Sequence, residues 1–216
     1  MEILNGRTQR ENLQNALEDR LVLLRQTSSA LLNRYGDIDA FKASFSKNLQ
    51  LVCAQNIRRC FTGIAAKLNA LQLAYGTENV IGWITYHLAD MFDYCSIHDK
   101  PSSEQMVDLA QIILTDNPNL NAAEFLLFIF QFKAGKYGRF FGTIDPLVVT
   151  TALNDFKTYR REKLIQYRDE EEAIRKQQER DESFERSVPM PGDLNNVREI
   201  LRMKDIDTVI IGVENE

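Results

Sequence analysis

The chain has 216 residues, a hydrophobic content of 44% and a formal net charge of −5. This length fits one domain with appendages, and this hydrophobic content is sufficient for a core. The acidic balance argues against a surface that coats nucleic acid non-specifically, although it is compatible with a local basic patch. Cys53, Cys60 and Cys95 are too few and too widely spaced for a disulfide framework or a zinc cluster, so we expect no metal and no cofactor.

The start of the chain, Met1 to Asn5, is polar, which predicts no secretory signal. The apolar runs are also far shorter than the about 20 residues that a membrane span needs. We therefore expect a cytoplasmic protein without a membrane partner.

Apolar residues at helical spacing predict three helices in the first half of the chain. They run from about Gln9 to Asn33, from Asp39 to Tyr75 and from Glu78 to Tyr94, with Thr77 as the cap of the third.

Three polar residues of the third helix, His87, Asp90 and Tyr94, share one face. A metal or acid–base cluster is one interpretation. The spacing lacks the paired ligands of a known metal site, so a hydrogen-bonded helix surface is the favoured interpretation.

Two capping boxes mark the next helices, one from Ser102 to Gln105 and one from Asn121 to Glu124. Phe125 to Phe132 then holds seven large apolar residues in eight positions, interrupted only by Gln131. An amphipathic surface helix would carry more polar positions, so we expect this helix to be buried on most sides.

A loop rich in glycine, aromatic and basic residues follows, from Lys136 to Gly142, after Gly135 ends the apolar helix. Asp145 and Pro146 begin the next helix as N-cap and first helical residue. The loop has two interpretations: a helix connection whose aromatic residues fill the core, or a loop that contacts phosphates and bases.

Large apolar residues stop after Tyr167, and the segment from Arg168 to Arg186 mixes both charge signs. The expected organisation is a helical domain (1–167), a charged helical extension (168–187), and a linker with a C-terminal tail (188–216). Within the tail, Asp207 to Val213 is typical of a strand. The fold class is all-α: a bundle of six or seven helices around Phe125–Phe132, with a long charged C-terminal helix and a flexible tail.

Basic residues concentrate around the loop and the helix after it, inside an otherwise acidic chain. Such a segment could bind a few phosphates, although a chance fluctuation of charge along a soluble helix is the alternative. The candidate nucleic-acid or partner-binding residues are Lys133, Lys136, Tyr137, Arg139, Phe140, Lys157, Arg160 and Arg161.

No catalytic pattern is present in the sequence: there are two histidines, no Gly-x-Ser-x-Gly, no HExxH, and the motif GKYGRFFG lacks the Gly-Lys-Ser/Thr ending of a Walker loop. We therefore expect a protein that is not an enzyme.

The stretch from Ser102 to Tyr167 resembles a family of uncharacterised proteins from Bacteroidetes phages, plasmids and integrated elements. The resemblance rests on a GKYGxFxGxIDP motif, which here runs from Gly135 to Pro146, and on Glu124, Lys133 and Arg160. The layout is also similar to that of helical loaders of replicative helicases, by analogy of fold alone.

This resemblance implies a non-enzymatic DNA-replication accessory of a phage or mobile element. Its expected partners are a replicative helicase or another protein, and single-stranded DNA. The alternative is a structural or interaction protein that forms homo-oligomers through its charged helix and C-terminal tail.

Overall fold

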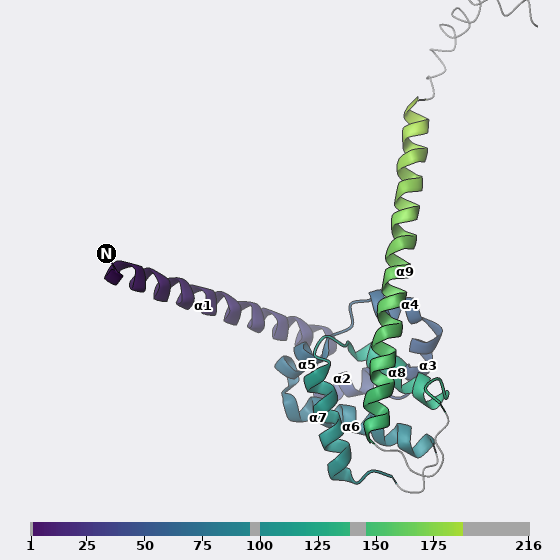
Figure 1. Cartoon of the computed structure of the whole chain (residues 1–216). Helices are drawn as coiled ribbons and strands as arrows, with labels where there is room; N and C mark the ends of the chain where they lie inside the picture. The colour runs from purple at the N-terminus through teal and green to yellow at the C-terminus, as the bar shows by residue number, and fades with distance from the viewer. Residues whose placement is uncertain (1, 96–99, 139–145, 188–216) are drawn as a thin grey trace, which may run out of the picture. The chain divides into compact units, whose positions relative to one another are not determined.

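A computed structural model describes residues 2–95, 100–138 and 146–187 of the chain, and these residues are almost entirely helical (Figure 1). The described ranges contain no β-strand, only an isolated bridge between Lys67 and Asn121, so the all-α prediction is confirmed. Their nine helices are α1 (Glu2–Tyr35), α2 (Ile38–Ser44), α3 (Leu49–Gln55), α4 (Ile57–Thr62), α5 (Leu68–Tyr75), α6 (Thr77–Tyr94), α7 (Ser103–Asp116), α8 (Ala122–Lys133) and α9 (Pro146–Ser187).

Helix α8 is the apolar helix of the sequence, and it packs against α3, α4 and α6. Its side chains from Phe125 to Ile129 have no exposed surface, and Phe132 is almost completely buried. The predicted burial is therefore confirmed. A helix that is apolar on all sides has no face to turn toward water, which explains why α3, α4 and α6 cover it.

Local residues define both ends of α8. The side chain of Asn121 accepts a hydrogen bond from the backbone N–H of Glu124, and the carboxylate of Glu124 accepts one from Asn121 N–H, which confirms the capping box. At the other end Gly135 has a φ of +75°. The N–H groups of Gly135 and Lys136 donate to carbonyls of the last helical turn, which is a Schellman motif.

The segment predicted as one helix from Asp39 to Tyr75 is instead four short helices, α2 to α5, so the described residues form more helices than six or seven. The first of them ends at Ser44, and the carbonyl of the next residue, Phe45, accepts hydrogen bonds from the ring nitrogens of Trp83 and His87. Bonds from a distant helix thus satisfy a backbone group that the break exposes. Apolar periodicity contains no information about such bonds.

The starts of two helices in this half of the chain differ from the predictions. The side chain of Asp37 caps α2, two residues before the predicted start at Asp39, because it accepts from the N–H of Ala40. Helix α6 begins at Thr77 itself, and Gly76, with a φ of +84°, occupies the N-cap position. The capping box at Ser102 and Gln105 is confirmed.

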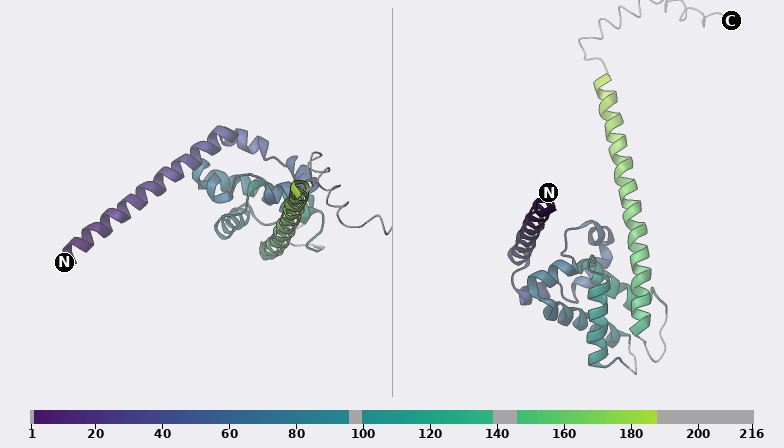
Figure 2. Two further views of the ribbon diagram at one scale, coloured as in Figure 1. Left: turned by 90° about the horizontal axis from the view of Figure 1, so that it is seen from above. Right: turned by 60° about the vertical axis from the view of Figure 1, so that its left-hand side comes forward.

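The chain divides into two compact units, Met1–Leu164 and Ile165–Glu216. Helix α9 contributes residues to both units (Figure 2). In the first unit, Phe156 of α9 is buried, and its ring lies 5.7 Å from that of Phe128.

In the second unit, the described side chains of α9 are mostly exposed up to Ser183. The predicted linker and strand within 188–216 lie outside the described residues. No helix in the described part of the chain has both the length and the apolarity to cross a bilayer.

Candidate binding sites

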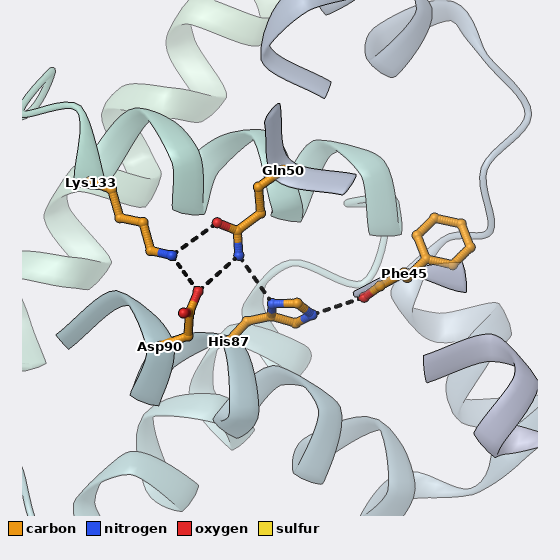
Figure 3. Close-up of polar contacts among 5 residues, drawn as sticks. All are labelled: Phe45, Gln50, His87, Asp90 and Lys133. Carbon is orange, nitrogen blue, oxygen red and sulfur yellow. Dashed lines mark hydrogen bonds and ion pairs between the residues drawn. The ribbon is translucent and has the colours of Figure 1, made fainter. Parts of the chain in front are cut away.

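Lys133, in the last turn of α8, belongs to a polar network that joins three helices (Figure 3). Its ammonium group forms an ion pair with Asp90 of α6 and donates to the side-chain oxygen of Gln50 in α3 at 3.0 Å. The amide nitrogen of Gln50 lies 3.2 Å from Asp90 Oδ2 and 3.3 Å from His87 Nδ1. Lys133 thus connects α3, α6 and α8.

His87 is fully buried within this network, which corrects the expectation of a helix surface. The carbonyl of Phe45 can only accept a hydrogen bond, so the ring carries its proton on Nε2, and Nδ1 accepts from Gln50. Burial lowers the pKa of His87 to about 4, against the opposing effects of Phe45 and Asp90. A neutral ring with both nitrogens engaged serves packing rather than proton transfer.

The other two members of the predicted cluster also serve this network. Burial acts to raise the pKa of Asp90, but the ammonium of Lys133 and the amide of Gln50 outweigh it, so the pKa is lower than usual. The exposed ring of Tyr94 lies 5.6 Å from Lys133 Nζ. Among the described residues, no group of three or more His, Cys, Asp or Glu could hold a metal ion.

Arg160 of α9 is held by Glu124, which is fully buried in the first turn of α8. Arg160 Nε donates to Oε1 of Glu124, while Oε2 of the same carboxylate closes the capping box. Burial raises the pKa of Glu124, and the charge of Arg160 opposes this shift. Arg160 therefore ties α9 to the first turn of α8.

Lys136 and Tyr137 share one acceptor, the side-chain oxygen of Gln131, at 3.1 and 2.7 Å. Tyr137 is half-buried, and its ring lies 5.7 Å from that of Phe128, as a core-filling residue would. Lys136 Nζ lies 3.3 Å from the centre of the Tyr159 ring in α9. Burial lowers the pKa of Lys136, and the nearby charge of Lys163 lowers it further, so two cations meet beside an aromatic ring.

Lys157 and Arg161 are exposed on α9, where Lys157 donates a hydrogen bond to Asn154 Oδ1 at 3.2 Å. Arg139 and Phe140 lie outside the described residues. The predicted set therefore divides: Lys133 and Arg160 hold internal ion pairs, whereas Lys136, Lys157 and Arg161 remain at the surface of the first unit.

A hollow of about 380 Å³ lies elsewhere in this unit, between the end of α1, α3, α4 and the segment before α5. Two arginines stand in its wall, Arg34 and Arg59. Arg34 donates to the carbonyl of Ile64 at 3.0 Å and lies over the ring of Tyr35. The other lining residues are mostly apolar and include Phe45, Leu49, Val52, Cys53, Cys60, Ala65 and Ala123.

Within the described part of the chain, neither Arg34 nor Arg59 forms an ion pair with a carboxylate. One signal in the sequence points to this region, and it is a pattern of charge rather than a motif. Positions 40 to 77 contain five lysines and arginines but no aspartate or glutamate, in a chain whose net charge is negative. The basic part of the molecule is thus wider than the loop and α9.

Residues 100–188 match the model of a family described as "Family of unknown function (DUF6633)". The match covers less than half of the chain, and it includes α7, α8 and the described part of α9. No curated protein and no solved structure matches the chain. The chain is therefore similar to a family whose function is itself unknown. The matched residues include Glu124, Lys133 and Arg160.

Proposed function

We propose that this protein is a non-enzymatic, cytoplasmic accessory of DNA replication in a phage or mobile element, and that it binds single-stranded nucleic acid. The binding surface is formed by Lys136, Tyr159, Lys163, Lys157 and Arg161. The proposal rests on one observation: the ammonium of Lys136 lies over the Tyr159 ring, and the charge of Lys163 is near enough to lower the pKa of Lys136.

Such a surface has the components that single strands require, because cations meet phosphates and an aromatic ring can stack on a base. The surface is small, so we expect it to neutralise about three phosphates and to bind weakly. The logarithm of the binding constant should then fall with the logarithm of salt concentration with a slope of about −2.

The test measures the fluorescence anisotropy of a labelled oligothymidylate at low salt with the full chain. Lys157→Glu with Arg161→Glu should weaken binding at least tenfold, because two cations that contact phosphates become anions. Both side chains are exposed, so the fold should be unchanged. The matched control is Arg175→Glu with Lys176→Glu, the same charge change on exposed residues of the same helix. Equal weakening by both pairs, or no binding by the unchanged protein, would contradict the proposal.

The hollow beside Arg34 and Arg59 favours a second candidate function, the capture of a partner protein. The two guanidinium groups lie at an apolar hollow and have no carboxylate partner among the described residues. They could bind the carboxylates of an acidic segment while one large apolar residue of that segment fills the hollow. A replicative helicase is the expected partner. Light scattering of the mixture with the purified host helicase should show a complex that Arg34→Glu with Arg59→Glu abolishes and Arg175→Glu leaves intact.

Oligomer formation through the charged helix and the tail is the third candidate. Between Ile165 and Ser183, the exposed large apolar side chains of α9 are only Ile165 and Ile174. Arg175 and Glu179, and likewise Lys176 and Glu172, form exposed ion pairs there. Deletion of the residues after Val188 tests the contribution of the tail. An unchanged mass by light scattering would exclude assembly through it.

A further inference from the structure

Helix α1 carries a band of four adjacent large apolar residues on its surface, from Leu21 to Leu24. Leu21 is 52% exposed, Val22 51% and Leu23 62%. Successive residues of a helix point in directions about 100° apart, so the band surrounds the helix. Contiguous apolar surface of this kind marks an interaction site, because soluble monomers rarely leave it in water.

The C-terminal part of the same helix is already packed. Thr27, Ser28, Leu31 and Tyr35 are half-buried, and α1 lies against α5 there. The Tyr35 ring lies 5.4 Å from that of Phe45. Leu21 and Leu24 continue this stripe toward the N-terminus at spacings of three and four residues, beyond the part that α5 covers.

The exposed charged residues beside the band are Glu18, Asp19 and Arg20 before it and Arg25 after it. Arg20 flanks the Leu21 and Leu24 stripe on one side, and Glu18 and Arg25 flank it on the other. Glu18 and Arg25 are seven residues apart, which is two helical turns, so both lie on one side of the stripe. Neither forms an ion pair with another described residue.

We propose that the α1 helices of two copies of this chain pair in antiparallel orientation through the band from Leu21 to Leu24. A two-fold axis then passes between these residues, and Leu21 of one copy lies opposite Leu24 of the other. Glu18 of each copy meets Arg25 of the other. Parallel pairing in register would place these charged residues of the two copies on opposite sides of the seam, out of contact, so the charges favour the antiparallel arrangement.

The interface is short, and its side chains are already about half covered. The dimer is therefore weak, and we expect a Kd on the order of 10 μM or higher, as for interfaces at the lower end of the usual area range. The band is distinct from the surface of the proposed function. Failure of nucleic-acid binding and failure of self-association are consequently separate results.

Sedimentation velocity of the full chain over a range of concentrations tests the proposal. The unchanged protein should dimerise reversibly. The Glu18→Arg and Arg25→Glu variants should each be monomeric at concentrations where the unchanged protein is a dimer. Each substitution places two residues of like charge opposite one another at positions 18 and 25 of the two copies. An equimolar mixture of the two variants should recover the dimer, since each of the two charge contacts across the antiparallel interface would then join one arginine to one glutamate.

The matched control is Asp19→Arg, which makes the same change of charge one residue away, on the side of the helix that turns from the stripe. It should dimerise like the unchanged protein, and circular dichroism should show equal helix content for all variants. A monomer up to about 500 μM, a dimer of either single variant as stable as the unchanged one, or a mixture that stays monomeric would overturn the proposal.

Discussion

Glu124 and Arg160 join the first turn of α8 to α9 through one carboxylate, whose second oxygen caps its own helix. The carboxylate is fully buried, and 31% of the Arg160 side chain is exposed. Because the two residues are 36 positions apart, this single contact links a local helix cap to the tertiary packing of α9.

Arg160→Met should destabilise the protein by about 3 kcal/mol, because it leaves the Glu124 charge buried without its partner. Urea unfolding measures the change. Adding Glu124→Gln to Arg160→Met should recover part of the loss, since a neutral amide needs no counter-ion and can still accept from the N–H of Asn121. A double variant as unstable as the sum of the two single variants would show that the residues do not interact.

Lys133→Met should lower the free energy of unfolding by about 3 kcal/mol, since Asp90 and Gln50 lose the ammonium that joins them. Lys157→Met is the matched control on the exposed side of α9, and its effect should stay below about 0.5 kcal/mol. Equal effects in chemical unfolding would mean that Lys133 is a surface residue like Lys157, as the sequence alone suggests.

Stability should fall on acidification because of His87. Its pKa is about 4 in the folded chain and 6.5 in an unfolded one. The unfolded state binds the proton more tightly, so this contribution is complete above pH 6.5 and is lost as the pH falls toward 4. The raised pKa of Glu124 has the opposite effect and favours the folded state as the pH falls. The lowered pKa of Asp90 acts like that of His87, because stability is lost once the pH falls below the usual pKa of a carboxylate.

The comparison of the unchanged protein with His87→Gln removes most of the effect of the two carboxylates. Between pH 7 and pH 4 the difference in unfolding free energy between the two proteins should shrink by about 3 kcal/mol. Urea unfolding at a series of pH values measures it. A difference that stays constant across this range would show that His87 is not buried in its neutral form.

Gly63→Ala and Gly82→Ala should change stability in opposite directions. A Cβ at position 63 would overlap the carbonyl oxygen of Arg59, so the backbone after α4 must move, at a cost of about 2 kcal/mol. A Cβ at position 82, on the exposed face of α6, meets nothing within 4 Å and should stabilise the helix by about 0.5 to 1 kcal/mol. Thermal unfolding of the two variants checks both signs.

Local patterns in the sequence predicted the parts of the fold that near neighbours decide. The capping boxes at Ser102 and Asn121 and the positive φ of Gly135 each involve residues within a few positions of one another. The burial of Phe125 to Phe132 follows from a segment with no polar side. These interactions close within one or two helical turns, so no knowledge of the rest of the chain is needed.

The roles of Lys133 and Arg160 depended on partners that lie far away in the chain. Asp90 is 43 residues from Lys133, and the carbonyl of Phe45 is 42 residues from the His87 ring that it binds. The sequence by itself determined a helical protein with an apolar rod and a surplus of cations behind it. Only the tertiary structure decided which cations are neutralised inside, because desolvation and pairing depend on what the fold brings within hydrogen-bonding distance.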